Sequence, residues 1–167
     1  LISGCAVSTQ QEVEMGAGYA QQINKELPLI QDAELNRYIN VLGDSIARIA
    51  DSRNLDWHFF IVDSKDVNAF AVPGGFIYMN RGLIERATNM AQVAGVLGHE
   101  VGHVTMRHSI QQMQKALQEQ SNRIYGDNSR TSNDLWAQFM GMQGPAMQGM
   151  MQAYMEQSQK MFAQFQE

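Results

Sequence analysis

Two histidines and a glutamate in the middle of the chain have the residue types and the spacing of a metal site. They belong to the segment Gly98-His99-Glu100-Val101-Gly102-His103, whose HExxH pattern on a helix is typical of a zinc site. At 100° per residue, His103 lies about 40° around the helix from His99 and one turn along it, so both imidazoles can reach one ion. Glu100 lies roughly 60° to 100° from each histidine, within reach of a water molecule at that ion.

This arrangement predicts hydrolysis of an amide bond. One zinc ion held by His99 and His103, with an open coordination position, would make water nucleophilic near neutral pH and polarise a carbonyl. Glu100 would take the proton from the water and pass it to the leaving amine. The five-residue pattern also arises by chance in unrelated helices, where the two histidines are ordinary core or surface side chains.

A zinc site of this kind needs a third protein ligand, and the sequence leaves its identity open. Glu156 is best placed by distance along the chain, although the methionines around it put it opposite the apolar face of its helix. No glycine lies between Val104 and Arg107 to turn the chain, so we expect the helix to continue and His108 to lie about 180° from His99. Glu119, if that helix continues, is about 24 Å along from His103. The ligand could also belong to a segment that this chain lacks.

The helix that carries the two histidines also has an apolar stripe for the core. The stripe lies about 120° to 220° from His99 and consists of Val93, Leu97, Val101 and Val104. We therefore expect packing and chemistry on different faces of this helix. Gly95, Gly98 and Gly102 line the boundary between the faces. Because each costs roughly 1 kcal/mol against alanine, we expect a strand or a bound peptide to pass close beside them.

The remaining elements are predicted from periodicity and from helix caps and turns. In chain order they are a helix over Thr9–Glu26 ended by Pro28, a helix capped by Asp32 and running to about Ala50, a strand at residues 57–62 with both faces covered, a short extended piece at Asn68-Ala69-Phe70-Ala71, a stop at Pro73-Gly74-Gly75, a strand at residues 76–79, a helix at residues 81–87, and the metal-site helix capped by Asn89. We expect His58 to be structural. After Glu119 we expect a loop at residues 126–133 and helices at residues 135–142 and 146–166.

Taken together, these segments resemble a known protein family. Val67-Asn68-Ala69-Phe70-Ala71-Val72-Pro73-Gly74-Gly75-Phe76-Ile77-Tyr78, then Gly82-Leu83, then His99-Glu100-Val101-Gly102-His103, is similar to the zinc metallopeptidase family of HtpX, BepA and the CaaX prenyl proteases. The resemblance covers roughly residues 57–109. It implies an α+β fold: a mainly helical, gluzincin-like domain with a small sheet packed on the active-site helix.

The resemblance also implies site residues. Asn68, Ala69, Phe70 and Ala71 would form an edge strand near the cleft, to which a substrate backbone adds as a further strand. The family's third ligand is a glutamate in a later Glu-x-x-x-Ala-Asp motif, which is absent here.

The first residues of the chain predict a membrane tether. Leu1-Ile2-Ser3-Gly4-Cys5 looks like a bacterial lipobox, in which Cys5 receives lipid, and Ala6 after it suggests the outer membrane. Against this, a processed lipoprotein would have lost the first four residues, and an ordinary apolar tail is the alternative. We accordingly expect a tether at residues 1–8, a metallopeptidase core at residues 9–119, and a helical segment of the same domain at residues 120–167.

The size and charge of the chain reduce the number of candidate functions. The 167 residues suffice for one domain with a core, and the net charge of -5 without a basic run argues against nucleic acid as a partner. The sequence contains no stretch of about 20 uninterrupted apolar residues, so it predicts no membrane span. The sequence thus predicts a periplasmic zinc endopeptidase that acts on extended or misfolded envelope polypeptides. The alternatives are a catalytically inactive, zinc-binding periplasmic chaperone of the same fold and a helical interaction protein with an accidental HExxH.

Overall fold

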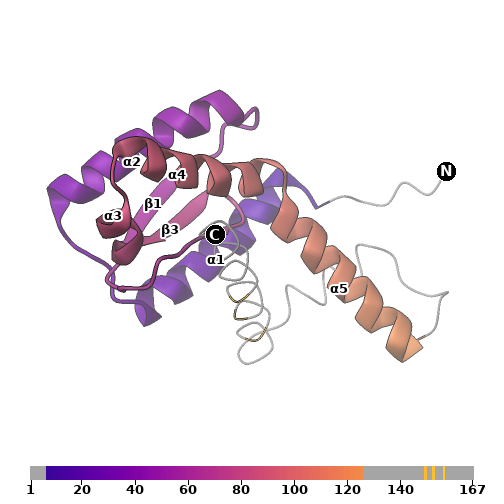
Figure 1. Ribbon diagram of the computed structural model, residues 1–167. Coiled ribbons are helices and arrows are strands. Elements are labelled where there is room, and N and C mark those ends of the chain that lie inside the picture. Colours follow the sequence, from indigo (N-terminus) through magenta and orange to yellow (C-terminus); the bar gives the residue numbers. More distant parts are fainter. Residues whose placement is uncertain (1–6, 126–148, 150–151, 153–155, 157–167) are drawn as a thin grey trace.

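The computed structural model describes residues 7–125 and the single residues 149, 152 and 156. Within this part, helices surround a small three-stranded sheet (Figure 1), which confirms the predicted α+β class. The elements are α1 (Thr9–Glu26), α2 (Ala33–Ala50), β1 (His58–Val62), β2 (Ala69–Val72), β3 (Phe76–Asn80), α3 (Arg81–Arg86), α4 (Met90–Thr105) and α5 (His108–Tyr125). They confirm the predicted elements from α1 to α3 to within one or two residues at each end, and they confirm the predicted start of α4.

Some predictions fall outside the described residues. Residues 149, 152 and 156 are helical, as expected for residues 146–166, whereas the loop at 126–133, the helix at 135–142 and Cys5 are not described. Helix α5 runs through the boundary predicted between residues 119 and 120.

The first two helices begin at strong local signals. Ser8 and Gln11 form a capping box, in which each side chain accepts a hydrogen bond from the backbone N–H of the other. The Asp32 carboxylate accepts from the Leu35 N–H at 2.9 Å. These bonds satisfy N–H groups that the first turn of a helix leaves without partners, and the Asp32 cap is why the sequence located the start of α2.

The sheet has the strand order β1-β3-β2, with β3 parallel to β1 and antiparallel to β2. The tight connection from β2 to β3 uses Gly74 and Gly75, whose φ angles are 88° and 104°. Side chains strain the backbone at such angles, so glycine is required there. At the β1 edge of the sheet, Leu29 forms an antiparallel bridge to Val62 and extends the pairing of β1.

Each face of the sheet is covered by a different helical layer. Helices α2 and α4 cover one face and α1 covers the other (Figure 1). The α2/α4 side is the larger core and includes Ile39, Ala47, Phe59, Ile61, Ala69, Ala71, Ile77, Met79, Leu97 and Val101. The α1 side includes Met15, Tyr19, Ile23, Val62, Phe70, Val72 and Tyr78. This arrangement confirms that β1 is covered on both faces, and it fixes α4 against the sheet.

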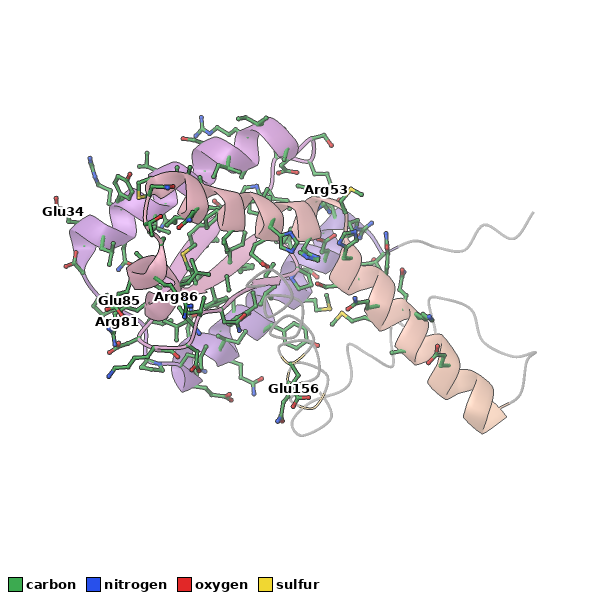
Figure 2. The ribbon with its side chains drawn as sticks, in the orientation of Figure 1. Glu34, Arg53, Arg81, Glu85, Arg86 and Glu156 are labelled. Carbon is green, nitrogen blue, oxygen red and sulfur yellow. The ribbon has the colours of Figure 1, made fainter. Side chains whose placement is uncertain are left out.

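Short connections hold the elements at the edge of this sandwich. Arg81, at the start of α3, forms ion pairs with Asp63 and Glu85. Figure 2 shows Arg81 and Glu85 close together. Asn40 of α2 donates to the Phe59 carbonyl and accepts from the Phe59 N–H, which joins α2 to β1. None of the helices in the described part of the chain is long and apolar enough to cross a membrane.

Two glycines within α1 provide a matched test of how this helix packs. A Cβ at Gly16 would lie 1.7 Å from the Pro73 carbonyl oxygen, whereas a Cβ at Gly18 would meet no described atom within 4 Å. We predict that Gly16→Ala lowers the free energy of unfolding by at least about 2 kcal/mol because the backbones must separate. Gly18→Ala should raise it by up to about 1 kcal/mol through helix propensity.

Urea unfolding followed by circular dichroism measures both changes. Equal effects of the two substitutions would contradict the close approach of α1 to the β2–β3 turn.

Candidate metal centre

Helix α4 carries the HExxH segment and is positioned by its cap and its apolar stripe. The Asn89 side chain accepts from the Gln92 N–H at 3.1 Å, as predicted. The stripe faces α2 and the sheet, and its members are at most 4% exposed: Val93, Leu97, Val101 and Val104. The orientation of α4 about its axis is therefore set by hydrophobic burial.

This orientation brings the two histidine rings of the motif together. The Nε2 atoms of His99 and His103 lie 3.0 Å apart, and the ring planes are inclined by 77°. Two nitrogen ligands of a tetrahedral zinc ion lie about 3.4 Å from each other, so a small ring movement would let both atoms bind one ion. The prediction that these imidazoles converge on one point agrees with the structure.

The histidines also have the protonation state that a metal ligand requires. Burial, together with the neighbouring His99 and His108 rings, lowers the pKa of His103 to about 4. Burial, and to a smaller degree His108, also lowers the pKa of His99. Neutral imidazoles at pH 7 present a nitrogen lone pair, which a divalent cation needs.

Glu100 differs from expectation in its degree of burial. Glu100 is only 1% exposed, and its Oε1 atom has no hydrogen-bond partner among the described residues. Burial raises the pKa of its carboxyl to about 8. The separation of packing and chemistry onto two faces is therefore incomplete, because Glu100 lies three residues after Leu97 and four before Val104, within the buried side of the helix. A buried polar atom without a partner is costly and fits a carboxylate that meets a further group at this site.

The prediction that one continuous helix extends beyond His103 to His108 is wrong. Helix α4 ends at Thr105, and Arg107 has a φ angle of 58°, so the chain turns before α5 begins at His108. As a result, the Nδ1 atoms of His108 and His103 lie 2.9 Å apart. His108 is therefore beside the motif and not on the far side of its helix.

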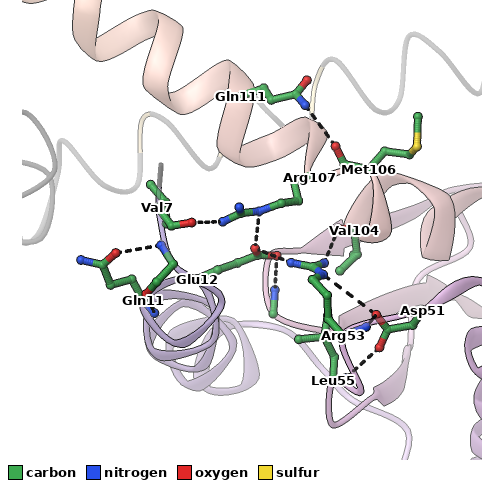
Figure 3. Close-up of polar contacts among 12 residues, drawn as sticks. Val7, Gln11, Glu12, Asp51, Arg53, Leu55, Val104, Met106, Arg107 and Gln111 are labelled. Carbon is green, nitrogen blue, oxygen red and sulfur yellow. Dashed lines mark hydrogen bonds and ion pairs between the residues drawn. The ribbon is translucent and has the colours of Figure 1, made fainter. Parts of the chain in front are cut away.

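A buried charge cluster explains this turn. Arg107 donates from Nε to Glu12 Oε2 at 2.8 Å and from Nη2 to the Val7 carbonyl. Arg53 donates to the same carboxylate oxygen at 2.8 Å and to the Val104 carbonyl at 2.9 Å. Figure 3 shows the Glu12 carboxylate between the two guanidinium groups. A left-handed residue other than glycine costs roughly 1 to 2 kcal/mol, which these charged hydrogen bonds offset.

Sequence reasoning missed Glu12, although a signal was present. Glu12 is spaced at helical intervals from Met15, Tyr19 and Ile23, all on the buried side of α1, and it is itself 0% exposed. A carboxylate on the apolar face of a helix requires a buried cation. The sequence does not reveal which of the chain's basic residues supplies it.

The expected substrate strand is present but enclosed. Asn68 precedes β2, which lies at one edge of the described three-stranded sheet. Ala69 and Ala71 face the α2/α4 core and Phe70 faces the α1 core. All four residues are at most 3% exposed, so their side chains serve packing in this structure.

The third ligand is not found within the described residues. No group of three His, Cys, Asp or Glu residues there could hold a metal ion. Glu156 is exposed and accepts a hydrogen bond from Gln152 at 3.5 Å. Figure 2 shows it well apart from Arg53, which donates to the Val104 carbonyl near the end of α4. The backbone that we expected beside the glycines of α4 is also not seen. A Cβ at Gly95 or Gly102 would meet no described atom within 4 Å.

Comparison with known proteins supports the chemistry suggested by this geometry. Residues 32–166 match the family model described as peptidase family M48. A β-barrel assembly-enhancing protease of Yersinia pestis is 37% identical over 118 residues, which cover 71% of this chain and 24% of that protein. One of Escherichia coli K12 is 38% identical over 112 residues, 67% of this chain and 23% of that protein. The chain thus spans about a quarter of the length of these relatives.

A shorter match is to a eukaryotic protein whose name is also that of a peptidase. The mitochondrial metalloendopeptidase OMA1 of Arabidopsis thaliana is 40% identical over 76 residues, which cover 44% of this chain and 16% of that protein.

The charge cluster at the turn between α4 and α5 can be tested by removing its anion. We predict that Glu12→Gln lowers the free energy of unfolding by about 2 to 3 kcal/mol, because it leaves two partly buried guanidinium groups without a counter-charge. Glu14→Gln is the control, since Glu14 is exposed on the same helix and its change should stay within about 0.5 kcal/mol. Denaturant unfolding of the three proteins gives these values. A Glu12→Gln protein as stable as the control would show that the cluster does not stabilise the fold.

Proposed function

The chain belongs to peptidase family M48, a family of metallopeptidases, and from this premise we propose that it is a zinc-dependent endopeptidase. Its substrates would be extended or misfolded proteins of the cell envelope. The observation that carries this proposal is the convergence of the His99 and His103 Nε2 atoms, 3.0 Å apart, on the helix that also presents Glu100.

The residues around the motif suit one metal ion. His99 and His103 would hold it through their Nε2 atoms, and both rings are neutral near pH 7, as their lowered pKa values indicate. When bound, zinc supplies a Lewis acid that polarises the scissile carbonyl and makes water nucleophilic near neutral pH. The remaining ligand would come from outside the described residues or from Glu156 after a rearrangement.

Glu100 would move the proton. Its carboxylate takes a proton from the attacking water at Oε1 or Oε2 and returns it to the nitrogen of the leaving amine. A pKa of about 8 is close to the operating pH, where a group accepts and releases protons with similar ease. The apolar side chains around Glu100, Leu97 and Val104 among them, keep bulk water away and strengthen its interaction with a developing positive charge.

An extended substrate would lie along β2 and beside α4. We propose that its backbone pairs with Asn68, Ala69, Phe70 and Ala71, a contact that uses the backbone because their side chains are buried. The position of β2 at the edge of the described sheet supports this placement, and pairing requires that this edge become accessible. The open space at Gly95 and Gly102 would accommodate the substrate backbone near the histidines.

Location and partners are part of the same proposal. Relatives named β-barrel assembly-enhancing proteases support action on envelope proteins, and the lipobox-like residues before Cys5 support a lipid anchor. The protein would then be a periplasmic lipoprotein attached to the outer membrane through Cys5, with polypeptides as its substrates.

A second function deserves comparison because no third ligand occurs in the described part of the chain. A zinc-binding chaperone of the same fold would bind unfolded envelope proteins without cutting them. The two functions differ in whether Glu100 is needed for a chemical step.

Replacing Glu100 distinguishes these functions. We predict that Glu100→Gln lowers the rate of casein cleavage by at least about 100-fold, because no group then accepts the water proton. Bound zinc, measured by elemental analysis, should stay at the wild-type level since Glu100 is not a ligand. His58→Ala is the control, because His58 lies on the α1 side of the sheet and stacks on Phe76. A wild-type protein that binds zinc and cuts no substrate would favour the chaperone.

Removal of the metal gives an independent test. We expect a chelator to abolish cleavage and added zinc to restore it. Zinc at 100 times its Kd should also raise the free energy of unfolding by about 2.7 kcal/mol, because the ion binds only the folded state. His99→Ala should lose both effects, and a chain whose stability does not respond to zinc would have no such site.

A further inference from the structure

His103 lies between two other histidines and uses both of its ring nitrogens. Its Nε2 is 3.0 Å from His99 Nε2, and its Nδ1 is 2.9 Å from His108 Nδ1. The His103 and His108 rings meet edge to face, with centroids 4.9 Å apart. The contact with His108 is therefore as close as the contact within the HExxH motif.

The two sides of the His103 ring must have different roles. A nitrogen that binds a metal ion needs its lone pair, so a neutral His103 that binds through Nε2 carries its proton on Nδ1. That N–H is half-buried and needs an acceptor. His108 Nδ1 lies at hydrogen-bond distance and accepts when the His108 proton is on Nε2. Metal-binding histidines generally donate their second ring N–H to such a partner, which fixes ring orientation and tautomer.

Geometry argues against His108 as a ligand of the same ion. The point shared by His99 and His103 lies at the Nε2 side of the His103 ring, whereas His108 contacts the Nδ1 side. One ion cannot occupy both sides of a single imidazole. His108 thus acts on the metal site through His103.

We propose that His108 is a positioning residue that accepts the Nδ1–H of His103 and holds this ring in its metal-binding tautomer and orientation. The proposal rests on the metal site of the proposed function. It assigns a role to a residue that lies outside the HExxH motif and that the motif spacing does not predict.

The contact exists because the chain turns between the two helices. On a continuous helix, His108 would lie about 140° around the axis from His103, out of reach of its Nδ1. The left-handed Arg107 changes the direction of the chain at the start of α5, and the Glu12 carboxylate accepts a hydrogen bond from the Arg107 Nε at 2.8 Å. The charge cluster on α1 is therefore connected to His103 through Arg107 and His108.

Zinc affinity tests this role in the full chain. We expect His108→Ala to weaken zinc binding by about 10- to 100-fold, as loss of a partner of a metal ligand usually does, when zinc is titrated against a chromophoric chelator. His108→Asn should restore most of the affinity, because its side-chain oxygen can accept the same hydrogen bond. His58→Ala should bind zinc like the wild type. The metal-free His108→Ala protein should unfold at nearly the wild-type temperature, since His108 is only partly buried.

Nitrogen NMR of the histidines gives a readout that a purely structural role would not change. The chain has four histidines, so each ring can be assigned. With zinc, we expect metal-bound Nε2 signals from His99 and His103, an Nδ1–H on His103 that is protected from exchange, and no metal-bound nitrogen on His108. In His108→Ala the His103 Nδ1–H should lose its protection.

The outcomes separate this proposal from the proposed function. Unchanged zinc affinity in His108→Ala, or a metal-bound nitrogen on His108, would overturn the positioning role and leave the peptidase proposal intact. A wild-type chain that binds no zinc would overturn the metal site, and the role of His108 with it.

Discussion

The carboxylate of Glu12, buried between two guanidinium groups, is the interaction on which the geometry of the site depends. It joins the start of α1, the loop after α2 and the link between α4 and α5 through Arg53 and Arg107. These segments are far apart in sequence, so the cluster forms only when the whole sandwich has assembled. Because a buried carboxylate without its cations is strongly unfavourable, the fold and the turn after α4 are linked. The histidines depend on that link.

Helix α4 has to satisfy two demands with one surface. Its apolar stripe buries against α2 and the sheet, and this burial sets the direction of the histidine rings. Glu100 lies partly within the same stripe and is almost completely buried. The free energy that burial of Leu97 and Val101 contributes offsets the cost of enclosing a carboxyl whose pKa rises to about 8. The raised pKa, which suits a proton-transfer group, is thus a direct consequence of how the helix packs.

The resemblance stated from sequence covers roughly residues 57–109, which lie within residues 32–166 of the family match. β2, β3 and α4 form one packed unit, in which Ala69, Ala71, Ile77 and Met79 contact the side of α4 opposite the solvent. Small alanines in β2 let the helix approach the sheet. The segments that carry the resemblance therefore combine the HExxH motif with contacts that orient its helix.

Local signals made much of the fold predictable. The helices α1, α2 and α4, their caps and the alternating strands follow from hydrogen bonds and hydrophobic periods within a few residues. The pairing of His99 with His103 follows from one turn of helix. Three features of the site could not be read in this way. The turn at Arg107 depends on Glu12, 95 positions earlier, and no local rule selects a left-handed arginine. The position of His108 beside His103 depends on that turn, and the extent of Glu100 burial depends on the packing of α4 in the core. Sequence determined which side chains could do chemistry, whereas tertiary structure decided which of them meet, because a buried ion cluster and not local propensity set the direction of the chain after α4.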